Sequence, residues 1–302
     1  MRTVLCGTAM APWSRVGRRC VGFAAVCLLA ATQLSAADYT YVRISVPGSV
    51  ETWANGINAQ GDIVGLYFTA DGGPFGYVLR KGVYTTIGHP DAEGLAARRI
   101  NSRGDIAGVL HDFDGGLHGF VLSGGQLTRI DRPGSTSTFA FGLNDAGDVV
   151  GLWGGGSFVL RDGKFRTAPS GGVRGVDYRL FDIQDNGRVL VGTAIGPTAI
   201  TGFISRRHGE IEHVEYPLPG ACTAFRGMNE RGDIVGSVAT GECFPPFGDA
   251  RGFVLRDGEF TPIHFPGAQG TDAWDINDDG VIVGRYIDGA GHLVGFKAKP
   301  NR

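Results

Sequence analysis

Six side chains stand at the same place in a repeating phrase, three positions before a recurring Asn or Gln, and their types suit ligand binding. They are Asn55, Arg98, Phe141, Phe181, Arg226 and Trp274. Arginine binds anions through paired N–H donors, and aromatic rings stack on other rings and on cations. We therefore predict that the two arginines and the three aromatic residues bind an anionic or sugar-like ligand. The competing interpretation is that strand alternation turns some or all of them between neighbouring sheets, where they only pack.

A second candidate site is the polar stretch from His111 to Gly116, in which His111, Asp112 and Asp114 could contact a ligand. Asp112 and Asp114 place oxygen atoms at alternate positions, as calcium loops do. The stretch lacks the later bidentate Glu of such loops, and Asp-Gly pairs are ordinary turn formers. We expect no cofactor, with calcium as the less favoured alternative.

The sequence shows no catalytic constellation. It contains no G-x-S-x-G phrase, and its seven His residues lack metal-ligand spacing. A carboxylate that recurs after a turn Gly is expected to be structural, because a catalytic group occurs once; the recurring ones are Asp62, Asp105, Asp148 and Asp233. Carboxylates for glycoside hydrolysis could still meet from separate loops, among them Asp112, Asp114, Asp177, Glu242, Asp249 and Asp272. An enzyme remains the less favoured alternative.

The elements that must position these residues come from a phrase that recurs six times, a form of G-I-N-x-x-G-D-I-V-G followed by a form of G-F-V-L-R-D-G. The marker residue advances by 43, 43, 40, 45 and 48 positions, through Asn58, Asn101, Asn144, Gln184, Asn229 and Asn277. Such a period indicates propeller blades or a solenoid.

Each repeat is predicted to be four short strands. In the third they are Thr138–Leu143, Asp148–Trp153, Ser157–Leu160 and Lys164–Thr167. The N-x-x-G phrase joins the first two strands as a tight turn, with Asn capping the backbone and Gly accepting a positive φ. No amphipathic helical pattern interrupts the strands.

Six antiparallel four-stranded sheets around an axis would cover one another's faces, so the fold class is all-β, a six-bladed β-propeller. The sixth repeat lacks its fourth strand, and Tyr41–Gly48 matches the fourth strand of other repeats. We therefore expect the N-terminal strand to complete the last blade and to bury Tyr41, Val42 and Ile44. The turns within hairpins one–two and three–four then share one face. The remaining loops and crossovers form the opposite, variable face, where ligands are expected.

Residues 1–37 are predicted to be a secretory signal peptide: three arginines precede an apolar run from Val21 to Leu34, and Ser35-Ala36-Ala37 offers a cleavage site. Residues 38–302 form the propeller domain, secreted or periplasmic after cleavage. No second run is long enough to span a membrane. The leader carries four of the 28 basic residues and none of the 30 acidic ones. The mature domain is therefore acidic, and we expect it not to bind nucleic acid. We expect a monomer.

Two cysteines, Cys222 and Cys243, remain after the leader is removed. In an oxidising compartment such a pair tends to close, and we predict a disulfide between them. Without His partners two thiols make a poor metal site.

The repeated phrase, followed by H-G-F-V-L at His118–Leu122 and by P-G-A or P-G-S at the crossovers, resembles the HAF repeat family of exported bacterial proteins. The resemblance covers residues 39–298 and implies propeller-like repeats, but no established reaction, cofactor or catalytic residue. The third copy has Ser157 for Gly, and the fourth has Gln184 for Asn and Arg188 for Asp. We expect these two blades to be distorted.

Taken together, these features predict a secreted, non-enzymatic propeller that binds a carbohydrate, peptide or protein through its variable face. Two alternatives stay open. One is an extracellular hydrolase or lyase acting on a polymer in the same cleft, and the other is a structural envelope protein.

Overall fold

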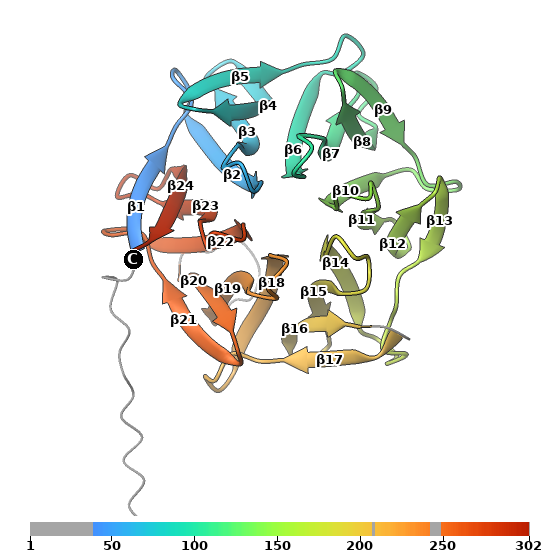
Figure 1. Cartoon of the computed structure of the whole chain (residues 1–302), viewed down its shortest axis with the longest axis vertical. Helices are drawn as coiled ribbons and strands as arrows, with labels where there is room; N and C mark the ends of the chain where they lie inside the picture. Colours follow the sequence, from blue (N-terminus) through green and yellow to red (C-terminus); the bar gives the residue numbers. More distant parts are fainter. Residues whose placement is uncertain (1–38, 207–208, 242–248, 302) are drawn as a thin grey trace, which may run out of the picture. The chain divides into compact units, whose positions relative to one another are not determined.

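Twenty-four β-strands form six four-stranded antiparallel sheets around a common axis in the computed structural model (Figure 1). The structure describes residues 39–206, 209–241 and 249–301. The expected signal peptide, residues 1–37, lies outside them. Each sheet is one blade, and no α-helix occurs in the described part of the chain. The predicted six-bladed β-propeller is confirmed.

The strands take equivalent places in all six blades. The inner strands, nearest the axis, are β2 (Glu51–Ile57), β6 (Gly94–Ile100), β10 (Thr138–Leu143), β14 (Asp177–Ile183), β18 (Ala221–Met228) and β22 (Gly270–Ile276). The second strands are β3 (Ile63–Thr69), β7 (Ile106–His111), β11 (Val149–Trp153), β15 (Leu190–Ile195), β19 (Ile234–Thr240) and β23 (Ile282–Ile287). The third strands are β4 (Gly72–Arg80), β8 (Leu117–Ser123), β12 (Gly156–Arg161), β16 (Ile200–Ser205), β20 (Arg251–Arg256) and β24 (Leu293–Pro300). The outer strands are β5 (Val83–Ile87), β9 (Gln126–Ile130), β13 (Lys164–Thr167), β17 (Ile211–Val214), β21 (Glu259–Ile263) and β1 (Tyr39–Ile44).

The N-terminal strand closes the ring as predicted. β1 pairs antiparallel with β24, from Tyr39 opposite Pro300 to Ile44 opposite Gly295, so the sixth sheet contains both ends of the domain. Ile44 is buried, but Val42 is 48% exposed, so its expected burial is wrong. Since side chains alternate along a strand, Val42 and Ile44 share one face, but the apolar cluster of Val46, Ala54 and Ile57 covers Ile44 and does not include Val42. On the opposite face Tyr39 is buried and Tyr41 is half-buried.

The aromatic residue of the G-F-V-L phrase supplies the core of every blade. Each one is fully buried: Tyr77, Phe120, Phe158, Phe203, Phe253 and Phe296. The clusters they join combine neighbouring blades, as where Ile204 of blade four packs with Phe225 and Phe253 of blade five. Burying one such side chain contributes roughly 1.5–3 kcal/mol. The core is therefore a set of interfaces between blades rather than one central body.

Side-chain amides link the blades into a closed ring at the face of the short turns. Each marker residue donates a hydrogen bond of 3.0–3.2 Å to the backbone carbonyl oxygen of the next marker. The ring runs through all six blades and returns from Asn277 to Asn58. Five of the six also cap their own turn by accepting from the backbone N–H four residues later, at 2.8–3.0 Å. The recurrent Asn thus has two structural tasks, of which the sequence indicated only the cap.

Blades three and four are regular, and their expected distortion is wrong. Gln184 keeps the amide ring intact by donating to the carbonyl oxygen of Asn229. Ser157 Oγ donates to the carbonyl oxygen of Tyr178 at 2.6 Å and accepts from the N–H of Leu180 at 3.0 Å. The hydroxyl therefore ties blade three to the inner strand of blade four.

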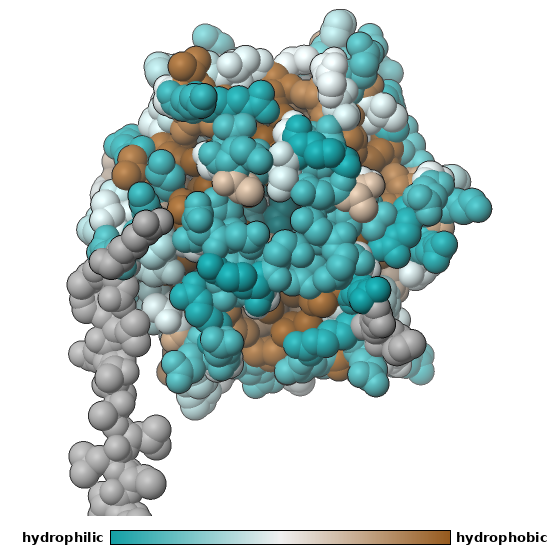
Figure 2. Space-filling model, in the orientation of Figure 1, coloured by the Kyte–Doolittle hydropathy of each residue, from teal (hydrophilic) through white to brown (hydrophobic). Residues whose placement is uncertain are grey.

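The centre of the molecule is polar. Figure 2, in the orientation of Figure 1, shows a hydrophilic surface around a small hollow at the axis, with hydrophobic side chains farther out. The apolar cores thus lie between blades, and the surface around the axis on this face is polar.

Candidate functional site

A β-bulge interrupts every inner strand at the position of the six predicted channel residues. The pairing register skips one residue in each blade, and the skipped residues are Asn55, Arg98, Phe141, Phe181, Arg226 and Trp274. A bulge re-aims side chains that strict alternation would send to opposite faces of the sheet. It lets two consecutive residues, such as Arg98 and Arg99, both point to the axis. The channel consequently has two adjacent layers of side chains.

The layer nearer the variable face is a cluster of three arginines around one indole ring. The guanidinium carbons of Arg98, Arg226 and Arg285 lie 5.7, 5.1 and 5.1 Å from the ring centroid of Trp274. Arg285, on β23, is not among the residues predicted from the sequence. Its signal was a charged residue directly after the V-G of its repeat, where the other copies have an uncharged one. We call Arg98, Arg226, Arg285 and Trp274 the arginine cluster.

Aromatic rings complete the wall of this layer. The Phe141 ring lies 5.6 Å from the guanidinium of Arg98, and the Phe181 ring lies 4.7 Å from that of Arg226. The two phenyl rings are themselves 5.1 Å apart. The structure therefore brings together the two arginines and three aromatic residues that were predicted to bind a ligand, rather than burying them separately between blades.

The positive charge of the arginine cluster is only partly neutralised. Asp272 Oδ2 accepts hydrogen bonds from Trp274 Nε1 at 2.7 Å and from Arg285 at 3.2 Å. Burial, together with the smaller effect of the neighbouring charges of Arg285 and Arg226, lowers the pKa of Arg98 to about 10. Burial likewise lowers the pKa of Arg226 and of Arg285, although Asp272 opposes the shift in both.

Several polar atoms in this layer are buried without a hydrogen-bond partner among the described residues. They are Nε of Arg98, Nε of Arg226, Oδ1 of Asp272 and Oδ1 of Asn55. Most buried polar atoms in native proteins have a hydrogen-bond partner, so a group of unsatisfied ones indicates a candidate ligand site. The layer is polar, charged and incompletely paired.

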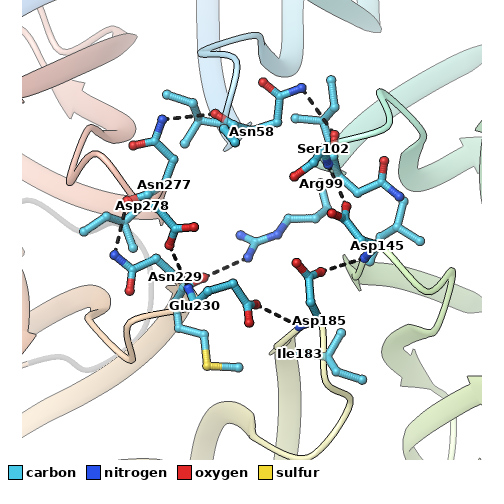
Figure 3. A pocket seen from close by; sticks show the side chains of 17 residues that line it. Asn58, Arg99, Ser102, Asp145, Ile183, Asp185, Asn229, Glu230, Asn277 and Asp278 are labelled. Atoms are coloured by element: carbon cyan, nitrogen blue, oxygen red, sulfur yellow. Dashed lines mark hydrogen bonds between the residues drawn. The ribbon is translucent and has the colours of Figure 1, made fainter.

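The next layer, toward the short turns, is fully paired. Arg99 forms salt bridges with Asp182 and Asp275, and neither carboxylate is exposed. Each carboxylate also accepts one bond from a neighbouring blade: Met228 N–H donates to Asp182 and Ile57 N–H donates to Asp275, each at 2.8 Å. A further bond to each comes from the N–H of the next residue in its own strand. Figure 3 shows Arg99 extending across the centre of the ring. We call these three residues the ion triad.

The ion triad occupies alternate blades, and glycine occupies the same position in the others. A Cβ on Gly142 would lie 2.9 Å from the Cα of Asp182, and one on Gly227 would lie 2.6 Å from the carbonyl oxygen of Trp274. Such contacts leave no room for a side chain. The sequence carried this signal as glycine alternating with charged residues, but we did not predict the triad.

Burial dominates the titration of the two acids. It raises the pKa of Asp182 to about 7, against the opposing effect of the Arg99 charge, and it raises the pKa of Asp275 in the same way. Burial alone would lower the pKa of Arg99, but the two carboxylates more than offset it and the pKa is raised. The triad closes the channel as a structural cross-link between blades two, four and six.

A shallow hollow of about 70 Å³ lies at the short-turn end, below the ion triad. Four carboxylates border it: Asp145, Asp185, Glu230 and Asp278. Each accepts the backbone N–H of the corresponding turn in the preceding blade, at 2.7–3.0 Å (Figure 3). These acids hold the turns in register, which is a structural role.

A groove of about 750 Å³ opens on the variable face between blades three and four. Phe139 and Phe141 line it and stack nearly parallel, with centroids 6.2 Å apart and an interplanar angle of 7°. Trp153 lines it as well, and the guanidinium of Arg132 lies 3.7 Å from the Trp153 ring. Because Phe141 lines the groove and also lies against Arg98, the groove adjoins the arginine cluster. We call it the aromatic groove.

The residues of the loop predicted as a second site, His111, Asp112 and Asp114, do not form one site. Burial and the nearby charge of Arg98 lower the pKa of His111, which puts this residue near the arginine cluster. Asp112 turns to the outer strands, where its Oδ2 is 2.8 Å from Nε2 of His118, and His118 Nδ1 is 2.6 Å from Asp131. Asp114 is exposed at the tip of the loop.

The carboxylate of Asp112 is occupied by the protein itself. Its Oδ1 accepts from the N–H groups of Asp114 and Gly116 at 3.1 and 2.6 Å. The bond to His118 holds the pKa of Asp112 below its usual range. Within the described residues, no three His, Cys, Asp or Glu side chains group as metal ligands.

The other sequence expectations concern single groups. Three of the recurring aspartates pair with the Arg of the hairpin three–four turn, Asp62 with Arg80, Asp148 with Arg161 and Asp233 with Arg256.

Cys222 is disulfide-bonded. Its expected partner, Cys243, lies outside the described residues, and so does Glu242. Nothing in the described residues resembles a membrane-spanning helix.

The fold defines the class of protein, a six-bladed β-propeller. No family model matches the chain, and no curated protein matches it. Among solved structures it is similar to the TolB candidate from Agrobacterium tumefaciens, with a TM-score of 0.57 and 12% identity over 83% of this chain and 91% of the other.

Two further propellers are similar. A gluconolactonase candidate aligns with a TM-score of 0.52 and 16% identity over 88% of this chain and 93% of its own. AofleA from Arthrobotrys oligospora aligns with a TM-score of 0.50 and 12% identity over 85% of each. At such identities the likeness shows the shared fold alone.

Proposed function

We propose that this protein is a non-enzymatic β-propeller that binds a carbohydrate in the aromatic groove of its variable face. The observation that carries the proposal is the aromatic lining: the stacked pair Phe139 and Phe141 faces a groove that Trp153 also lines. Concave surfaces with aromatic walls and a few polar groups are the usual sites for small ligands. A flat pair of rings offers a stacking surface for a sugar.

The distribution of carboxylates favours recognition over hydrolysis. Asp177 is the one carboxylate among the described residues that line the groove, and its partner is Arg179 at 2.8 Å. The desolvated pair, Asp182 and Asp275, is sealed by Arg99 and by backbone N–H groups. A glycosidase needs two carboxyl groups that face the scissile bond. The described residues that line the groove hold no such pair, which favours recognition over glycoside hydrolysis there.

We further propose that the protein acts outside the cytoplasm after removal of residues 1–37, and that it belongs with the exported HAF-repeat proteins. The disulfide at Cys222 supports the first point, because disulfides persist in oxidising compartments. The repeated phrase supports the second.

A glycan array probed with the mature domain, residues 38–302, followed by calorimetric titration, tests the proposal. Phe139→Ala is expected to weaken binding about 30-fold, the effect of losing a central aromatic contact. Phe113→Ala is the matched control, because Phe113 is 69% exposed in the separate loop of blade two. Glycan binding that ignores Phe139→Ala would refute a site in the aromatic groove.

A further inference from the structure

Three cations in contact with one ring, Arg285 buried and Arg98 and Arg226 half-buried, require an explanation. Guanidinium groups repel one another, and each loses hydration on burial, so like charges normally gather inside a protein only with counter-charges. In the arginine cluster three arginines surround Trp274, and Asp272 accepts hydrogen bonds from Trp274 and Arg285. Among the described residues, Arg98 and Arg226 form no salt bridge, and the Nε atom of each is buried without a hydrogen-bond partner.

The indole and phenyl rings stabilise the cations without neutralising them. A cation over an aromatic face gains about 0.5–2 kcal/mol, which is small beside the penalty for burying an unpaired charge. The guanidinium Nε atoms of Arg98 and Arg226 are buried and have no hydrogen-bond partner in the described part of the chain. The Nε–H group of each side chain can therefore donate a hydrogen bond to a ligand.

The cluster continues into the aromatic groove. Phe141 lines the groove and also contacts Arg98, and Phe181, the next ring, contacts Arg226. The charge of Arg179, a groove residue, also lowers the pKa of Arg226, so the two lie within electrostatic range. A ligand stacked on Phe141 could therefore reach the guanidinium groups.

We propose that the arginine cluster is an anion site and that the ligand of the aromatic groove is an acidic carbohydrate, bound through a carboxylate or sulfate group on Arg98 and Arg226. This inference rests on the proposed carbohydrate function for the sugar and on the cluster for the charge. Arginine pairs with such oxyanions through two parallel N–H donors. The aromatic groove selects a sugar ring, and the arginine cluster selects its acid group.

The first experiment titrates the mature domain with oligogalacturonate and with its methyl ester, which has the same rings without the charge. The acid is expected to bind at least 10-fold more tightly than the ester, and Arg98→Gln or Arg226→Gln is expected to remove that preference. Arg166→Gln, an exposed arginine of β13, is the matched control. Equal binding of acid and ester, or a preference that survives both substitutions, would overturn the inference.

The second experiment omits the sugar. Sodium sulfate is added at constant ionic strength, with chloride as the balancing salt, and thermal unfolding is followed. Sulfate is expected to raise the melting temperature of the wild type and of Arg166→Gln more than that of Arg98→Gln, because a ligand of the folded state stabilises it. Equal shifts in all three proteins would contradict the anion site.

The outcomes separate the two proposals. Specific stabilisation by sulfate with no binding of any glycan leaves the anion site standing and refutes the carbohydrate function. If neutral glycans bind in a way that depends on Phe139 but not on Arg98, and sulfate shifts all variants equally, the carbohydrate function stands and the anion site is refuted. Absence of both responses refutes both proposals.

Discussion

Arg98 and Arg99 are consecutive residues of β6, and their surroundings differ completely. Arg99 has two carboxylate partners, and its partners in turn accept backbone N–H groups from neighbouring blades. Arg98 has two aromatic rings, two arginine neighbours and a buried Nε with no partner among the described residues. A buried charged side chain whose hydrogen-bond and ion-pair partners all come from the protein has a structural role. One that lacks some of these partners can bind a ligand. The β-bulge makes this contrast possible by turning both residues to the axis.

The largest effect is expected from Arg99→Met. The substitution leaves Asp182 and Asp275 buried without their counter-ion, and breaking a buried pair in this way costs about 3–5 kcal/mol. Urea denaturation should show the midpoint falling with an unchanged slope. A loss below about 1 kcal/mol would mean that the ion triad does not hold the blades.

The second prediction concerns the amide ring that surrounds the ion triad. Asn101→Ala removes the donor to the carbonyl oxygen of Asn144 and the acceptor for the N–H of Asp105. Unsatisfied buried groups of this kind cost about 1–3 kcal/mol. Gln126→Ala is the control, because Gln126 is an exposed amide at the start of β9. Comparable losses in both variants would show that the ring is not a distinct source of stability.

The third prediction uses the pH dependence of the ion triad. Burial raises the pKa of Asp182 to about 7, whereas an unfolded Asp has a pKa of about 3.9. The folded state therefore binds the proton more tightly, and the contribution of Asp182 to stability is full below about pH 4 and is lost as the pH rises through about 7.

Paired denaturation curves of the wild type and Asp182→Asn from pH 4 to pH 8 test this sign. The stability difference, wild type minus variant, should decline with rising pH by on the order of 1 kcal/mol or more. A difference that grows with pH would mean that Arg99 keeps both carboxylates ionised throughout.

The smallest effect is expected from Arg98→Met. The variant loses two cation–π contacts and also the repulsion from Arg226 and Arg285, and these changes oppose each other. The unfolding free energy, measured without oxyanions in the buffer, should change by less than about 1 kcal/mol. A larger loss would assign Arg98 a structural role like that of Arg99.

The fold was accessible from the sequence because its signals repeat. The N-x-x-G turns, the G-F-V-L strands and the closing N-terminal strand each depend on local turn chemistry, periodicity or blade pairing, and the structure contains all three. The closing strand spans Tyr39–Ile44, which is earlier than the predicted Tyr41–Gly48. The six channel positions were also accessible, since they stand at a constant distance from the marker residue.

The interactions across the channel were not accessible in the same way. Asp182 and Asp275 lie 83 and 176 residues after Arg99 along the chain. Arg285 comes from the second strand of its blade rather than from the inner one. Which side chains meet at the axis depends on the bulge in each inner strand, and strict alternation does not predict it. The aromatic groove likewise combines loops of two blades, so only the closed ring reveals it.

The most direct test of the difference between the two layers is one pair of denaturation curves, Arg98→Met and Arg99→Met, in the same sulfate-free and phosphate-free buffer at pH 7. Arg99→Met should lose about 3–5 kcal/mol of unfolding free energy, while Arg98→Met should stay close to the wild type. Equal losses in the two variants would contradict the account, because both layers of the channel would then be structural.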